Sequence, residues 1–151
     1  MKIPESRVML SPFSLLQENS AASSPALTGS AAGISPAEWA RTPKMGVNTL
    51  AFRVAQNEAF YMVDADCVGI LNHLTPWEKN KQWLHLLSYS NTPLFVSCTD
   101  EIPDECKEDL RTAYKVFNEE KPHEFEPVDI YDERIPSKWK IDGKIVEYDW
   151  K

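Results

Sequence analysis

Short apolar runs alternate with amphipathic segments through the middle of the chain, between about Thr42 and Asn118. Two runs, Phe60–Val63 and Thr92–Cys98, are too short for helices and are typical of strands buried on both faces. Segments with apolar residues at helical spacing flank these runs, at residues 43–56, 75–90 and 103–118. The order helix, strand, helix, strand, helix predicts an α/β protein with a parallel sheet and right-handed crossovers.

A parallel sheet of two strands is incomplete, because each strand leaves a row of backbone groups unpaired and a face uncovered. The predicted helix over 75–90 has the strongest local signal, since Thr75, Pro76 and Glu78 form a capping box with a proline start. We therefore expect the segment 41–118 to be part of a larger parallel sheet.

The two ends of the chain differ from this middle part. The run Asn19–Gly33 consists almost entirely of Ala, Ser, Gly and Pro, and it buries too little apolar surface to offset its ordering entropy. Residues 1–40 are therefore predicted to be a low-complexity leader, in a loop or disordered. Residues 119–151 are predicted to form an acidic linker and a tail in which Asp142-Gly143 joins two strands of a hairpin. A hairpin is marginal alone in water, so it must pack on other structure.

Charge and cysteine usage exclude several classes of protein. The formal net charge is −7, and the stretch from Asp100 onward holds 16 of the 23 acidic residues and 9 Lys and Arg. The sequence therefore shows no basic face of the kind that a nucleic-acid partner needs. No run approaches the roughly 20 apolar residues of a membrane span, which makes a soluble protein the expectation, in the cytoplasm or outside it. The spacing of Cys67, Cys98 and Cys106 fits neither a disulfide framework nor a zinc site, so we expect these cysteines to be small buried hydrophobes.

Three stretches together resemble the C-terminal part of α-galactosidase-type, melibiase-like glycoside hydrolases. They are D-A-D-C at Asp64–Cys67, T-P-L-F-V-S at Thr92–Ser97, and the polar turn that leads into Lys107–Leu110. The resemblance covers residues 41–117 and implies the last units of a (β/α)₈ TIM-type barrel followed by a short β-hairpin tail. It also implies a galactoside-like carbohydrate substrate and a retaining two-aspartate mechanism with no metal and no organic cofactor. The nucleophile and the acid/base are expected upstream in the family, and nothing before Arg41 matches them; Ala65 replaces the usual proline.

The pair Asp64 and Asp66 is predicted to lie at the carboxyl end of the first strand, on the active-site rim of such a barrel. A glycosidase needs one carboxyl on each side of the scissile bond, whereas neighbours on one strand approach from the same side. We therefore expect these aspartates to be hydrogen-bonding supports, with loop-tying carboxylates or a direct catalytic role as the alternatives. Cys67 and Ser97 are expected beside them as substrate-binding residues. Weaker candidates are Arg41, Arg53 and His73 as rim residues, and Trp77 and Trp83 as stacking platforms or core residues.

Three functional hypotheses follow. The first is a fragment of a glycoside hydrolase that is inactive alone because its nucleophile is missing. The second is a non-catalytic carbohydrate-binding or interaction module. The third is a truncated product that does not fold alone, since half a barrel exposes two sheet edges and the apolar faces of its helices; two copies that cover each other's edges would be one remedy.

Overall fold

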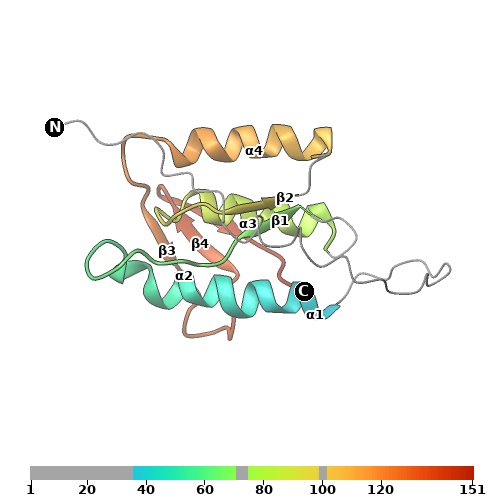
Figure 1. Ribbon diagram of the computed structural model, residues 1–151. Helices are drawn as coiled ribbons and strands as arrows, with labels where there is room; N and C mark the ends of the chain where they lie inside the picture. The colour runs from blue at the N-terminus through green and yellow to red at the C-terminus, as the bar shows by residue number, and fades with distance from the viewer. Residues whose placement is uncertain (1–35, 71–74, 99–101) are drawn as a thin grey trace.

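A computed structural model describes residues 36–70, 75–98 and 102–151, and shows several helices around two small sheets (Figure 1). The described part begins with a helical stretch made of α1 (Pro36–Thr42), the π-helical turn η2 (Pro43–Val47), α2 (Asn48–Arg53) and the 3-10 turn η3 (Val54–Gln56). Pro43 explains the wider turn, because proline lacks an N–H and its ring clashes with the carbonyl four residues earlier. The helix predicted over 43–56 is therefore confirmed, and helical structure begins at Pro36, inside the segment expected to be a leader.

The parallel sheet consists of β1 (Val68–Ile70) and β2 (Val96–Cys98), with α3 (Trp77–Ser88) between them in the chain. Parallel pairing around a helix is confirmed. The expected strand at 60–63 is wrong, because a turn at residues 58–60 and an isolated bridge at Tyr61 follow η3, and Val63 is buried outside any strand. The next apolar run, five residues on, pairs with β2 instead. The parallel sheet of the described residues has two strands, so the barrel stays a prediction.

The two long helices form where their sequence periodicity predicts them. Helix α3 buries one stripe that includes Trp83, Leu84 and Leu87, and α4 (Asp104–Phe117) packs against it. The indole N–H of Trp77 donates to Asp109 Oδ2 at 2.8 Å, which adds a polar tie between the helices. The predicted capping box is not formed, since Pro76 occupies the cap position of α3 without a side-chain hydrogen bond.

The second sheet is antiparallel and has the order β3 (Phe125–Pro127), β4 (Lys138–Ile141), β5 (Lys144–Glu147). The predicted hairpin is confirmed as β4 and β5. Asp142 and Gly143 have φ values of 47° and 78°, and positive φ at both central residues is the mark of a type I′ turn, whose twist matches that of the strands. Strand β3 is an addition that the sequence pattern did not indicate.

The helices and both sheets share one hydrophobic core. Trp139 from β4 is fully buried, and it belongs to the same cluster of buried residues as Leu50 of α2, Val68 of β1 and Leu87 of α3. In Figure 1, α4 runs along one side of the strands and the α1–α2 stretch runs along the other. The hairpin therefore packs on other structure, as expected. Within the described ranges, no helix combines the length and apolar character needed to cross a membrane.

Candidate functional site

The D-A-D-C motif lies in a segment whose side chains alternate between core and solvent. Val63 and Ala65 are 1% and 2% exposed, whereas Met62, Asp64 and Asp66 are exposed. Alternation with a period of two places Met62 and Asp64 on one face of the extended part of this segment. Asp66 is exposed two residues further on, where the chain turns, so both carboxylates reach solvent beside the buried side chains of Val63 and Ala65.

Contacts from three elements hold this segment in place. Asn57 accepts a hydrogen bond from the N–H of Val63 at 2.9 Å, and Trp83 of α3 donates its indole N–H to the carbonyl of Cys67 at 3.3 Å. At Gly46 in η2, an added Cβ would lie 2.8 Å from the Ala65 carbonyl oxygen. Because the helix approaches this closely, the buried face of the segment has little freedom to move.

The aspartates also bond to the backbone of their own segment. Asp64 Oδ1 accepts the N–H of Asp66 at 2.9 Å, and Asp66 Oδ1 accepts the N–H of Cys67 at 2.8 Å. Asp66 has φ +84°, a conformation that residues other than glycine adopt at a cost and that concentrates at binding and catalytic sites. A carboxylate has two oxygens and about four lone-pair directions, so each aspartate retains acceptor capacity toward a ligand.

The structure separates Ser97 from the aspartates. Ser97 of β2 pairs with Gly69 of β1, which lies three residues after Asp66 in the chain. The expectation that Ser97 and Cys98 end on the same rim as Asp66 is wrong, because Asp64 and Asp66 precede β1 instead of following a strand. In the described residues the predicted site therefore reduces to Asp64, Asp66 and Cys67.

Cys67 is unsuited to act as a nucleophile at neutral pH. Burial raises the pKa of its thiol, and the nearby carboxylates of Asp66 and Asp64 raise it further. The reactive form of cysteine is the thiolate, so this side chain stays a weakly polar thiol. All three cysteines are free, and Cys106 is buried as predicted, while Cys67 and Cys98 are half-buried.

Of the weaker candidates for site residues, the structure places two in the core and two on the surface. Trp77 and Trp83 are 6% and 0% exposed and belong to the core, so neither can stack on a sugar. Arg41 and Arg53 are exposed, and His73 lies outside the described residues.

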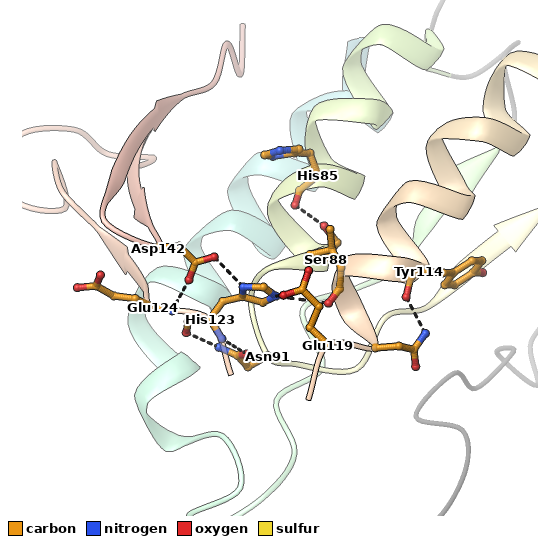
Figure 2. A network of polar contacts seen from close by, with 10 residues as sticks. His85, Ser88, Asn91, Tyr114, Glu119, His123, Glu124 and Asp142 are labelled. Atoms are coloured by element: carbon orange, nitrogen blue, oxygen red, sulfur yellow. Dashed lines mark hydrogen bonds and ion pairs between the residues drawn. The ribbon is translucent and has the colours of Figure 1, made fainter. Parts of the chain in front are cut away.

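A polar cluster that sequence reasoning missed surrounds His123, between the end of α4 and the hairpin turn (Figure 2). Its side chain is 8% exposed, with Nδ1 2.8 Å from Asp142 Oδ2 and Nε2 4.0 Å from Glu119 Oε2. Asn91 holds the backbone of His123 with two hydrogen bonds of 2.9 Å. The hydrogen bond with His123 is the main reason that the pKa of Asp142 lies below its usual value. No sequence signal links these residues, which come from three separate places in the chain: Asn91, the stretch from Glu119 to His123, and Asp142.

His123 also lines a groove of about 880 Å³ between the end of the first helical stretch and the end of α4. Its walls come from Ala51, Val54, Ala55, Asn57, Glu58, Ser88, Asn91 and residues 117–123 and 125–127. In the described residues, no group of three or more His, Cys, Asp or Glu side chains is arranged to hold a metal ion.

Comparisons of the chain with models of protein families, with curated protein sequences and with solved structures found no match.

Proposed function

We propose that this chain is a piece of a glycoside hydrolase of the α-galactosidase type, in which Asp64 and Asp66 bind the hydroxyl groups of a galactoside-like sugar. The observation that carries the proposal is the exposed, anchored pair of carboxylates in the D-A-D-C motif. The resemblance of this motif and of Thr92–Ser97 to the family supplies the class of substrate.

The chemistry of the pair suits sugar binding. Hydroxyl groups donate hydrogen bonds, and a bond to a charged carboxylate is roughly twice as strong as one between neutral groups. A segment that is already held in place loses little conformational entropy when a ligand binds. Asp64 and Asp66 are two residues apart on one short segment, so they support the sugar and do not flank the scissile bond as an acid and a nucleophile must.

An NMR titration of the ¹⁵N-labelled chain with methyl α-galactoside tests the proposal. The amides of residues 62–67 should shift in a saturable way, with a dissociation constant on the order of 1 mM, which corresponds to about −4 kcal/mol. Asp64→Asn and Asp66→Asn keep an oxygen that accepts the same backbone N–H, so the segment stays in place while the charge is lost. Each variant should weaken binding by about tenfold.

Asp132→Asn is the matched control, because it removes an exposed carboxylate from a different loop. The proposal fails if residues 62–67 do not shift, or if both Asn variants bind the sugar as the unaltered chain does. An assay with an aryl α-galactoside addresses catalysis separately, and we expect no turnover from this chain alone. Clear turnover that Asp64→Asn abolishes would contradict the supporting role of the pair.

A further inference from the structure

Each ring nitrogen of His123 faces a group that can only accept a hydrogen bond. Nδ1 lies 2.8 Å from Asp142 Oδ2, and this carboxylate is ionised at neutral pH, because the hydrogen bond with His123 holds its pKa below the usual value. Nε2 lies 3.4 Å from the carbonyl oxygen of Val116 and 4.0 Å from Glu119 Oε2. A neutral imidazole has one N–H and can serve only one of these sides, whereas the imidazolium form has two.

The side of the ring at Nε2 is the carboxyl end of α4. Val116 belongs to the last turn of this 14-residue helix, where the final carbonyls carry the negative end of the helix dipole. Its carbonyl oxygen also accepts the N–H of Glu119 at 3.0 Å, and a carbonyl has a second lone pair for the imidazole. The position of the ring therefore suits a positive charge.

The uncharged neighbours of the ring do not compete for its protons. Tyr89 packs edge to face against His123 with the ring centroids 4.8 Å apart. Burial, together with the charges of Glu119 and Asp142, raises the pKa of the Tyr89 hydroxyl, so it stays neutral. Asn91 bonds only to backbone atoms of His123.

Most charged side chains around the histidine are carboxylates. Beyond Asp142 and Glu119, the groove that His123 lines also has Glu58, Glu120 and Glu126 in its walls. In the described residues, the cations of this region are Lys121 in the groove wall, Lys144, whose charge acts on Asp142, and Lys140, which is ion-paired with Glu124 and Glu126. The excess of negative charge favours a charged imidazole.

We propose that His123, with a proton on both nitrogens, is a pH-dependent clasp that joins the end of α4 to the turn of the β4–β5 hairpin (Figure 2). Loss of the second proton leaves one N–H for Asp142 and breaks the link to Val116 and Glu119. His123 and Glu119 both line the groove of about 880 Å³, so the clasp also controls one wall of that groove. The clasp does not depend on sugar binding at the D-A-D-C motif.

Two charges set the pH range in which the clasp is closed. The pKa of Asp142 is lowered, so its contribution to stability is present above the unfolded value of about 4 and is lost as the pH falls through the folded value. The second proton of His123 adds stability that is complete below the unfolded histidine value of about 6.5 and is lost as the pH rises through the titration of the folded side chain. The clasp is therefore closed in mild acid and opens in alkaline solution.

NMR titration of the histidine ring protons tests the charge pair. Asp142→Asn keeps an oxygen for the N–H of Glu124, which the aspartate accepts at 3.0 Å, and Asn-Gly suits the same turn. The midpoint of the His123 titration should move to lower pH by about one unit, a tenfold weaker hold on the proton. Asp132→Asn, which changes an exposed carboxylate in another loop, is the matched control and should leave the midpoint unchanged. An unchanged midpoint in Asp142→Asn would overturn the proposal.

The pH dependence of stability separates a clasp from simple packing. His123→Gln should raise the unfolding equilibrium constant by about tenfold in mild acid and by much less in alkaline solution. His85→Gln is the control for the loss of an imidazole, because burial lowers the pKa of His85 and its replacement should show the opposite pH trend. Equal destabilisation by His123→Gln at every pH would mean that the ring only fills space, and would contradict the clasp.

Discussion

The contact at Gly46 gives a sharp test of how the D-A-D-C segment is held. A Cβ at this position would lie 2.8 Å from the Ala65 carbonyl oxygen and from two ring carbons of Trp83. Contacts this short must lengthen by roughly half an ångström before they become ordinary van der Waals contacts. Trp83 is fully buried and bonded to the Cys67 carbonyl, so neither neighbour is free to move.

The expected size of the Gly46→Ala effect is a difference between two terms. Alanine is a better helix former than glycine by about 1 kcal/mol, which favours the variant. An extra carbon in a packed interior costs about 1–3 kcal/mol, which opposes it. Because three atoms lie at 2.8 Å from the added carbon, we expect the cost to fall at the upper end of that range. The net loss is then about 2 kcal/mol, or roughly 4–8 °C in the melting temperature of a chain of this length.

Gly69→Ala is the matched control, because no atom of the described residues lies within 4 Å of a Cβ built at that strand position. Removing glycine from a strand without a clash should stabilise the protein by about 0.4–1 kcal/mol. Urea unfolding followed by tryptophan fluorescence measures both variants, and the two changes should have opposite signs. If Gly46→Ala is as stable as the unaltered protein, the close contact between η2 and the segment is refuted. Amide NMR shifts at residues 64–67 should accompany the loss of stability.

Three further predictions concern the core, an acid and a thiol. Trp139→Ala should lower the free energy of unfolding by about 3–5 kcal/mol. It should leave a single unfolding transition, because the fully buried indole joins the hairpin to the common core. Separate melting of the hairpin, followed by near- and far-UV circular dichroism, would contradict this. Burial favours the neutral form of Asp129, but hydrogen bonds from Lys138 and Ser137 outweigh it and hold the pKa below its usual value. Asp129 therefore contributes stability above its unfolded pKa of about 4, and this contribution is lost as the pH falls through the lower folded pKa. Asp129→Asn should make stability depend less on pH in that range of an acid unfolding curve. An unchanged curve would refute the stabilising role of the Asp129 carboxylate. Burial also raises the pKa of the Cys106 thiol, so alkylation followed by mass spectrometry should modify Cys106 only after unfolding, and rapid native modification would contradict its burial.

The helices and the hairpin could be predicted because their signals are local. The apolar stripe of α3 and the Asp142-Gly143 turn each lie within a few residues of the structure that they specify. Local signals could not predict the position of β1, because Phe60–Val63 and Val68–Ile70 are both short apolar runs. The choice between them depends on pairing with β2, far along the chain, and on the indole of Trp83, which bonds the carbonyl just before β1.

This non-local choice also explains why only part of the candidate site was predicted. The motif itself identified Asp64, Asp66 and Cys67, but the place of Ser97 followed from a strand end that does not exist at Val63. The His123 cluster could not be predicted at all, since the side chain of Asn91 and the hairpin turn meet the histidine only in the folded chain.

The burial pattern of the segment from Asn57 to Cys67 separates a part held by the core from an exposed part. Its base is fixed through Val63 and Ala65, which are 1% and 2% exposed, while Phe60 at its tip is 86% exposed. A change at the base, such as Gly46→Ala, should therefore disturb the carboxylates of Asp64 and Asp66. Phe60→Ser removes a side chain that the core does not hold, so it should leave the stability of the protein and sugar binding at the carboxylates unchanged. The two variants together distinguish a loss of sugar binding caused by the fold from a change confined to the exposed turn.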